Sequence, residues 1–251
     1  MSDTLQPARL LAALDATWAA AERAAIGEWI VRRGAGGGNR VSSVWPKGDP
    51  GAPVADAVES AVRIQRAWDQ PPLFQIGPED GALDALLEAK GWRAFDRTLM
   101  MTADPAAVAA HGLSGRMAVC VRCPLLVVDE IWSGDGVGPA RRAVMARTPA
   151  PREVFLLREA DRPAAVVFCA AADGVAMLHA LAVAPAFRRR GVAASACAAV
   201  GRWAVEQGAE TLALAVTEAN EPARALYAKL GFVDAFAYHY RAAPDAAGSP
   251  R

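Results

Sequence analysis

A stretch near the end of the chain repeats a stretch of its first half, and this repeat constrains the fold more than any other feature. Residues 83–100 align with residues 223–240 without a gap, and Gly91 falls on Gly231, where both aligned helices are expected to end. Strand, loop, helix and strand are expected in the same order upstream of each copy. Few residues are identical, so element order carries the inference of two related units.

The composition fits a folded protein with room for two compact units. The chain has 251 residues, of which 53% are hydrophobic. Lys and Arg number 27, as do Asp and Glu, so bulk charge gives no sign of a nucleic-acid or membrane partner. The first residues lack a signal-peptide pattern, and no apolar run suits a bilayer span. We expect a cytoplasmic protein, monomeric or homodimeric, with neither nucleic-acid nor membrane partners.

Hydrophobic periodicity predicts the elements of both halves. In the first half it predicts helices within 7–25, after Pro53 and over 83–90, and strands over 29–33, 40–45, 73–76 and 95–102. In the second half it predicts strands over 117–122, 154–159, 164–170, 175–183 and 211–216, helices over 126–132, 139–146, 192–207 and 222–230, and a strand up to 241. This order favours a mixed α/β sheet over a doubly wound one.

A glycine-rich run, 34–38, follows the strand expected at 29–33. It lacks the Lys-Ser/Thr ending of a phosphate loop and, in our reading, a following helix. We therefore interpret it as a hairpin connection.

The segment from Leu178 to Gln207 carries the clearest chemistry. An apolar strand ends at Val183, and an arginine-rich loop with Gly191 leads into an amphipathic helix. Unpaired amides and the helix dipole at such a start suit a pyrophosphate, and glycine lets the backbone approach it. A solvated basic turn before an ordinary helix would explain the charge alone.

This segment resembles the acyl-CoA-binding motif of the GCN5-related N-acetyltransferase (GNAT) superfamily, Gln/Arg-x-x-Gly-x-Gly/Ala, which Arg188, Gly191 and Ala193 match. The resemblance implies that loop amides hold the CoA pyrophosphate and that a bulged, splayed strand meets the pantetheine arm. The cofactor-binding residues it implies are Leu181, Val183, Arg188, Arg189, Arg190, Gly191, Val192, Ala193 and Asn220.

A second motif lies downstream. Asn220, Ala223, Leu226, Tyr227, Gly231 and Phe232 are similar to the family pattern Asn-x-x-Ala-x-x-Leu-Tyr-x-x-x-Gly-Phe. In the family the asparagine contacts the cofactor and the tyrosine hydroxyl lies near its sulfur. A phenol is neutral at physiological pH and suits protonation of a leaving thiolate. Taken alone, Tyr227 would be a half-buried helix aromatic.

The general base is the least defined part of the expected site. His179 lies in the strand before the arginine loop and titrates near neutrality. The local run resembles that of arylalkylamine N-acetyltransferases, which have two histidines here, but Met177 occupies the first position. His179 is thus a candidate base or relay, with a packed strand histidine as the alternative. Tyr238, His239 and Tyr240 are further ionisable groups near the expected acceptor side.

The four cysteines give no metal site. Cys120 and Cys123 form a C-x-x-C pair, but no second pair stands at zinc-finger spacing, so we expect small packed side chains. Cys169 and Cys197 lie in an apolar strand and helix without a base partner, which argues against a covalent thiol intermediate.

The fold class expected is α/β, with a mixed, mostly antiparallel sheet, a splayed central strand pair and two GNAT-like units. We expect a degenerate GNAT-like domain at 1–112, a catalytic GNAT domain at 113–243 and a disordered tail at 244–251. Leu87 replaces Tyr227 in the first copy, and its loop, 47–53, lacks the arginine motif. The function implied is direct acetyl transfer from acetyl-CoA, as cosubstrate, to an amine, without a metal. The alternative is a non-catalytic acyl-CoA-binding or sensing protein. The acceptor, small amine or protein, stays open.

Overall fold

A computed structural model describes residues 6–149 and 151–246. The first half contains α1 (Pro7–Thr17), β1 (Glu22–Ile26), β2 (Trp29–Arg33), α2 (Asn39–Ser42), α3 (Val54–Ala67), β3 (Leu73–Ile76), α4 (Gly81–Ala89), β4 (Arg93–Ala103) and α5 (Pro105–Ala110). The second half contains β5 (Met117–Cys120), α6 (Leu126–Gly134), α7 (Pro139–Arg147), β6 (Arg152–Glu159), β7 (Arg162–Ala172), β8 (Val175–Val183), the 3-10 turn η1 (Pro185–Phe187), α8 (Val192–Glu206), β9 (Thr211–Thr217), α9 (Glu221–Lys229) and β10 (Val233–Ala242).

Eight of these strands form one sheet that runs through both halves. Their order is β3-β10-β4-β9-β8-β7-β6-β5, and β1 and β2 form a separate hairpin. Only β8 and β9 pair in parallel, and the other neighbours are antiparallel. The expected mixed, mostly antiparallel sheet is therefore confirmed.

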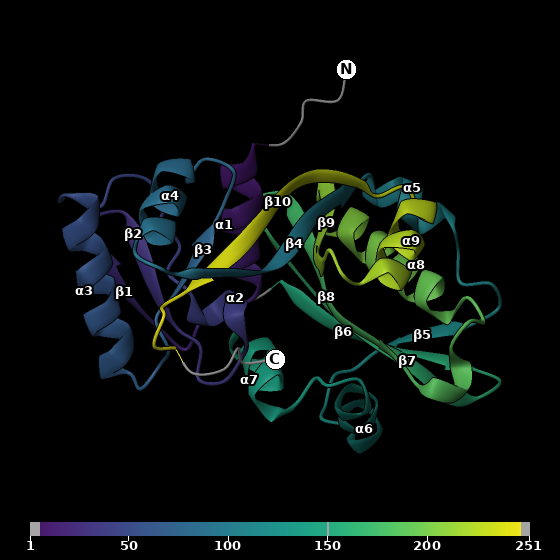
Figure 1. Cartoon of the computed structure of the whole chain (residues 1–251). Helices are drawn as coiled ribbons and strands as arrows, with labels where there is room; N and C mark the ends of the chain where they lie inside the picture. The colour runs from purple at the N-terminus through teal and green to yellow at the C-terminus, as the bar shows by residue number, and fades with distance from the viewer. Residues whose placement is uncertain (1–5, 150, 247–251) are drawn as a thin grey trace.

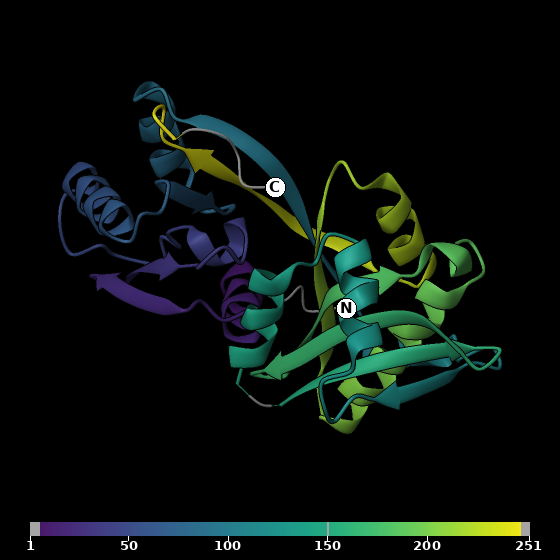
Figure 2. The same ribbon diagram turned by 90° about the horizontal axis from the view of Figure 1, so that it is seen from below.

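The two halves exchange strands at the centre of this sheet. β10, the last strand of the second half, lies between β3 and β4 of the first, and β4 lies between β10 and β9. Figure 1 shows β4 and β10 as long ribbons that cross together from one half to the other, and the view from below in Figure 2 shows the same pair joining them.

The aligned repeat corresponds to matching elements. Residues 83–100 lie in α4 and β4, and residues 223–240 lie in α9 and β10. Both strands depart from regular pairing, because the β10–β4 register shifts between Asp234 and Phe236 and again between Tyr238 and Tyr240. Asp96 in β4 has φ of 54°, which fits a bulge at the second shift.

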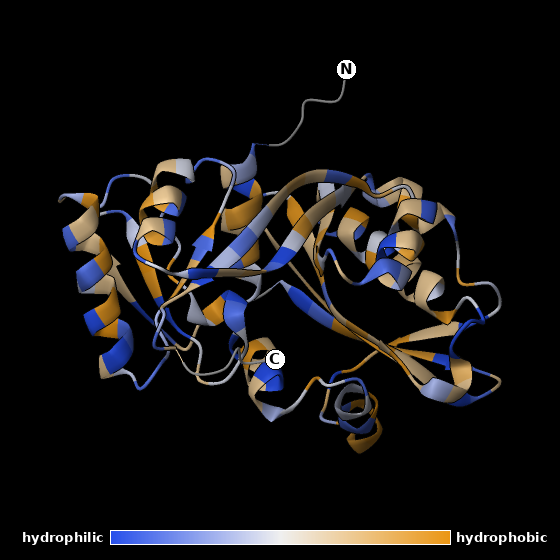
Figure 3. Cartoon of the chain, viewed as in Figure 1, coloured by the Kyte–Doolittle hydropathy of each residue, from blue (hydrophilic) through white to orange (hydrophobic). Residues whose placement is uncertain are grey.

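Helices cover both faces of the sheet. α1 packs against β7 and β8, whereas α8 packs against β6, β7 and β8 and also against α5. The α5–α8 contact requires Gly201, because a Cβ there would lie 2.8 Å from the Ala109 backbone nitrogen. α3 is amphipathic: it buries Ala57, Val58 and Ala61, and hydrophilic residues lie along its outer side (Figure 3).

Several sequence-based expectations were wrong. Residues 22–26 form strand β1 instead of continuing a helix, because they pair along their whole length with β2. Residues 39–42 form the short helix α2, and only single bridges, Ile30 to Trp45 and Val44 to Phe74, remain of the strand expected at 40–45. Residues 104–115 were expected to be a connector without regular structure, but they contain α5, which Asp104 caps by accepting a hydrogen bond from the Ala106 amide.

The expected tail at 244–251 falls partly outside the described residues, but Asp245 is described and pairs with Arg66 at 2.5 Å. Cys169 and Cys197 are buried as expected, whereas Cys120 and Cys123 are exposed. This C-x-x-C pair is therefore not part of the core. β5, at whose end Cys120 lies, is an edge strand without a packed outer face.

Candidate functional site

The central parallel pair of the sheet opens after four residues. β8 and β9 pair from Val175↔Thr211 to Leu178↔Leu214, and beyond Leu178 the strands have no shared register. β8 continues along β7 as far as Val183, but its register shifts between Val166 and Phe168. The expected splayed central pair is therefore present.

A bulge in β8 produces this opening. Ala180 adopts φ of 48°, an uncommon conformation for a residue with a side chain. Its carbonyl accepts a 2.8 Å hydrogen bond from the Trp132 indole of α6, which holds the bulge in place. The segment from His179 to Val183 is thus a strand edge without a β9 partner, as a ligand-binding edge requires.

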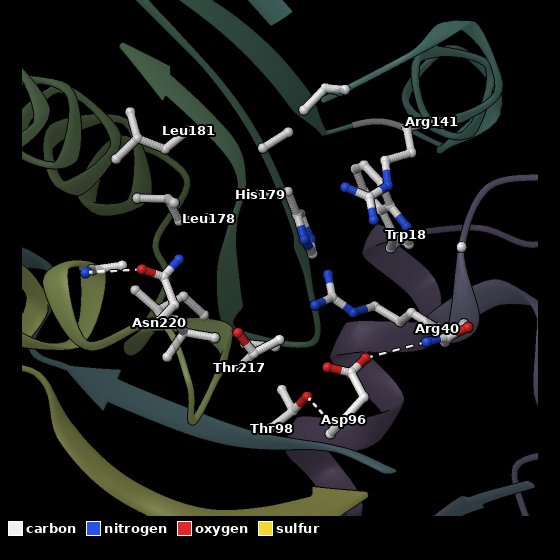
Figure 4. A pocket seen from close by; sticks show the side chains of 18 of the residues that line it. Trp18, Arg40, Asp96, Thr98, Arg141, Leu178, His179, Leu181, Thr217 and Asn220 are labelled. Carbon is white, nitrogen blue, oxygen red and sulfur yellow. Dashed lines mark hydrogen bonds between the residues drawn. The ribbon is translucent and has the colours of Figure 1, made fainter. Parts of the chain in front are cut away.

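A cavity of about 660 Å³ lies at the splay. Its walls come from β8 and β9, from the start of α9 with Asn220 and Tyr227, and from the first half through Trp18, α2 and β4. Figure 4 shows Leu178, Leu181 and Asn220 on one side of it and Trp18, Arg40 and Arg141 on the other. The cavity therefore joins the two halves.

The expected pyrophosphate loop lies beside this cavity but does not line it. Gly191 precedes the first residue of α8 and has φ of 80°, in the left-handed region that favours glycine. A Cβ at Gly191 would meet nothing closer than the Arg116 guanidinium at 3.9 Å, so backbone conformation, and not space, requires the glycine. Val192 and Ala193 form the first turn of α8, where amides are free to bind an anion.

The three arginines of the loop differ in their partners. Arg188 pairs with Asp135 at 2.9 Å and donates from Nε to the Val183 carbonyl, and Arg190 pairs with Glu159 at 3.4 Å. Arg189, with φ of 61°, is exposed and has no ion pair among the described residues.

Arg116 connects the arginine loop to α8 and to Glu159. It donates to the Arg190 carbonyl, to Ser195 Oγ at 3.2 Å and to Glu159 at 3.2 Å.

Asn220 and Tyr227 lie on the α9 side of the cavity. Asn220 is the N-cap of α9, and its Oδ1 accepts from the Ala223 amide at 3.2 Å, which leaves its side-chain NH₂ facing the cavity region. Tyr227 is buried and packs edge-on against Phe232. Burial raises the pKa of Tyr227 far above its usual 10, so the phenol stays protonated, but its acidity no longer matches that of a thiol.

His179 faces the opposite wall and is 3% exposed. Its Nε2 lies 3.0 Å from Thr17 Oγ1, and the Thr17 hydroxyl donates its only proton to the Ala13 carbonyl at 2.7 Å. The Thr17 oxygen must therefore accept, so Nε2 carries the imidazole proton and Nδ1 carries a lone pair. Nδ1 is buried without a partner in the described structure. Burial, and then the charge of Arg40, hold the pKa of His179 well below its ordinary 6.5, which keeps it neutral.

Of the expected site residues, the cavity brings together Leu181, Asn220, Tyr227 and His179, while Val183 and residues 188–193 lie outside its lining. Of the further candidates, Tyr240 lines the cavity, Tyr238 is buried outside its lining, and His239 pairs with Asp84 at 3.0 Å.

Sequence reasoning missed four charged residues that line the cavity: Arg40, Asp96, Asp135 and Arg141. Only Arg40 had a local signal, since it follows the glycine run.

Comparisons with known proteins agree with this geometry. Residues 128–232, which contain the splayed strand, the arginine loop and Tyr227, match the Acetyltransferase (GNAT) family. This part of the chain therefore resembles a GNAT domain. A relative named "Uncharacterized N-acetyltransferase YobR", from Bacillus subtilis (strain 168), is 27% identical over 250 residues, or 96% of this chain and 99% of the relative. Both the description of the matched family and the name of this relative are those of acetyltransferases.

Solved structures share the fold over both halves. A GCN5-related N-acetyltransferase from Kribbella flavida has a TM-score of 0.74 at 21% identity and covers 95% of each chain. A tandem GNAT protein from the clavulanic acid biosynthesis pathway has a TM-score of 0.55 at 16% identity, covering 86% of this chain and 78% of that one. The GNAT fold is thus accompanied by a two-unit arrangement in a known structure.

No group of three or more His, Cys, Asp or Glu side chains within 6–149 and 151–246 is placed to hold a metal ion. Among the same residues, no helix has the length and apolar character needed to span a membrane.

Proposed function

We propose that this protein transfers an acetyl group from acetyl-CoA directly to an amine. The observation that carries the proposal is the cavity at the β8–β9 splay, which has Tyr227 on one wall and neutral His179 on the other. A thioester laid along the free edge of β8 would place its carbonyl between these two side chains. Transfer would then need only proximity and two proton movements.

The proposed cofactor contacts follow the exposed backbone. Residues Arg188 to Ala193 would hold the pyrophosphate at the α8 N-terminus, where dipole and unpaired amides favour an anion. The pantetheine arm would run along the edge that β8 leaves unpaired, meeting the Leu181 and Val183 amides. The Asn220 NH₂ would bind the arm from the α9 side, since its Oδ1 is already used as a helix cap.

Proton handling falls to the two opposed side chains. The attacking amine must be neutral and must lose a second proton as its bond to the acetyl carbon forms, while the thiolate of CoA leaves. We assign His179 Nδ1 to accept a hydrogen bond from this amine or from an intervening water. Because the pKa of His179 is lowered, the imidazole would pass the proton on and would not remain protonated. Tyr227 would donate its hydroxyl proton toward the leaving sulfur and stabilise the thiolate.

A covalent thiol intermediate is disfavoured by the cysteines. Burial raises the pKa of Cys197 to about 12 and that of Cys169 well above its usual value. Neither would be a thiolate at physiological pH, so neither is an activated nucleophile. Direct transfer needs no such group.

We assign catalysis to residues 113–243 and treat 1–112 as a degenerate unit that shapes the acceptor side. Support comes from Leu87, which stands where Tyr227 stands in the second unit and is fully buried. The first unit nevertheless lines the cavity through Trp18, Arg40 and Asp96. We propose a cytoplasmic location and a monomer or homodimer.

Calorimetric titration with acetyl-CoA, and then with CoA, tests the cofactor site. We expect both to bind the native protein, and Gly191→Glu to abolish binding by adding negative charge and a strained side chain at the cradle. Gly208→Glu is the matched control, because Gly208 has φ of 70° with open space around it and lies at the other end of α8. Absence of binding to the native protein would overturn the proposal. Equal loss in both variants would show that folding, and not the cradle, was damaged.

A further inference from the structure

One wall of the cavity, built by both halves, carries charge that the proposed acetyl transfer does not use. Arg40 comes from α2, Asp96 from β4 and Arg141 from α7, and all three line the cavity. In Figure 4 the Arg40 guanidinium points into the space between Asp96 and His179, and Arg141 points into the same space from beside Trp18. Two guanidinium groups from different halves therefore face one space.

These two guanidinium groups lack carboxylate partners. No ion pair among the described residues includes Arg40 or Arg141, and Arg40 Nε is buried without a hydrogen-bond partner. By contrast, the buried Arg32 pairs with Asp15 at 3.2 Å and also donates to Ser43 and Gln75. Both arginines are partly buried, and the buried Nε of Arg40 without a partner is costly unless a ligand satisfies it.

The charges of the wall sum to a single excess positive charge. Asp96 accepts a 3.2 Å hydrogen bond from Asn39 Nδ2. Among the described residues that line the cavity, it is the one carboxylate without an arginine pair, since Asp135 is bound to Arg188. Burial and then the charge of Arg40 lower the pKa of Arg141, as expected for two cations that share a space. One negative charge on a ligand would balance the set.

The glycine run explains how the two arginines meet. Gly38 has φ of 97°, and a Cβ there would lie 3.6 Å from Arg141 Nε. A Cβ at Gly37 would lie 2.6 Å from Val144 in α7, too close for any side chain. The run therefore lets α7 approach the loop before α2, which brings Arg141 opposite Arg40. Asn39 Oδ1, beside Arg40, is also buried and unpartnered.

We propose that the acceptor is a small amino acid, a primary amine with one carboxylate, whose carboxylate binds between Arg40 and Arg141. This inference rests on the proposed acetyl transfer and names its acceptor. The planar carboxylate matches the guanidinium donors, and its single charge balances the excess. The amine then points to the β8–β9 splay, where His179 and the thioester would lie, and Asp96 attracts its ammonium form before transfer.

The neighbouring charges argue against other acceptors. A phosphate dianion would leave net negative charge beside Asp96. A plain amine would leave both guanidinium groups unpaired. A lysine within a protein chain has no free α-carboxylate. A second, acidic residue of the same protein would have to enter the cavity of about 660 Å³ together with the lysine and the thioester arm.

The test measures acetylation of matched acceptors by CoA release. Each proteinogenic amino acid is compared with its own carboxamide, and aminoalkylphosphonates supply the dianionic comparison. We expect kcat/KM for the preferred acid to exceed that of its carboxamide by about 10- to 100-fold, the effect of a charged hydrogen-bonded pair. Arg40→Gln and Arg141→Gln should each remove this preference by lowering activity on the acid alone.

Controls separate this inference from folding and from the proposed function. Arg63→Gln removes the same charge from an exposed position on α3 and should keep the acid preference. Arg141 is only half-buried, so Arg141→Gln keeps the test available if Arg40→Gln fails to fold. If kcat/KM for carboxamides or phosphonates equals that for the acids, the inference is overturned, but the proposed acetyl transfer is not. Binding of acetyl-CoA without acetylation of any amine would overturn the proposed function, and the inference with it.

Discussion

Thr17 and His179, 162 residues apart in sequence, are joined by a 3.0 Å hydrogen bond between Thr17 Oγ1 and His179 Nε2. The bond fixes the tautomer of the imidazole, because the Thr17 hydroxyl proton is committed to Ala13. It also joins the helix that opens the first half to the strand that carries the proposed chemistry. The tautomer of His179 is therefore set by a residue outside the GNAT match.

The buried state of His179 predicts how stability depends on pH. Its folded pKa lies well below the unfolded value of 6.5, so the unfolded chain binds more protons between the two values. The contribution to stability is full above pH 6.5 and falls as the pH drops below it. Replacing His179 with Gln should flatten the free energy of unfolding against pH by up to about 1.4 kcal/mol per pH unit in this window.

Denaturant unfolding at pH values from about 5 to about 7 measures this slope. His111→Gln is the control, because His111 is exposed and should leave the slope as it is in the native protein. Parallel curves for the native protein and His179→Gln would contradict the assigned burial of a neutral imidazole.

Tyr227→Phe tests the proposed proton donor. The change removes one hydroxyl and keeps the packing against Phe232, so acetyl-CoA affinity should be unchanged while turnover falls by about 100-fold. Since the pKa of Tyr227 is raised, activity of the native protein should show no loss from this phenol up to about pH 10. Steady-state kinetics on one acceptor, with calorimetry for acetyl-CoA, gives both quantities. Equal turnover in the two proteins would remove Tyr227 from the reaction.

The three loop arginines should contribute unequally to acetyl-CoA binding. Arg189 has no ion pair among the described residues, whereas Arg188 and Arg190 must share their charge with Asp135 and Glu159. Arg189→Gln should therefore weaken binding most, by about 3- to 10-fold at low salt, and the difference should shrink as salt rises. Titration of the three single variants at two ionic strengths measures the order. A larger loss for Arg188→Gln or Arg190→Gln would mean that acetyl-CoA displaces the carboxylates.

The exchanged strands predict cooperative unfolding of both halves. Met100 in β4 is fully buried, pairs with Phe236 and Ala215, and shares a core cluster with Leu10 and Met177. Met100→Ala should cost about 2–5 kcal/mol and lower amide-exchange protection in β3 and β8 together.

Leu126→Ala is the control for this variant, since Leu126 is 75% exposed and its loss should cost no more than about 0.5 kcal/mol. Loss of protection limited to the first half would show that the halves unfold independently.

Local motifs allowed the second half to be predicted well. The bounds of β8 match the expected 175–183, and α8 and α9 begin within a residue of their expected starts, because capping, glycine and periodicity are local signals. β1 was missed because its alanines have high helix propensity, which pairing with β2 overrides. The 39–42 helix was read as a strand because the glycine run resembles a hairpin turn.

The charged wall of the cavity could not be predicted from the sequence. Arg40, Asp96 and Arg141 stand in three separate elements, and no spacing in the sequence relates them. Their meeting depends on the close packing of α7 on the glycine run and on the bulge at Asp96. The exchange of β4 and β10 was likewise hidden, since strand order across a sheet leaves no periodic trace.

The interleaving of β4 and β10 resembles the strand exchange of a domain-swapped dimer, with the two exchanging units joined in a single chain. A product truncated before Val233 would lose β10, and with it the strand that pairs with both β3 and the facing edge of β4. The sheet would then be open between the two halves. Bare strand edges pair readily with other chains. Prematurely terminated chains should therefore aggregate often and should rarely remain soluble and partly active.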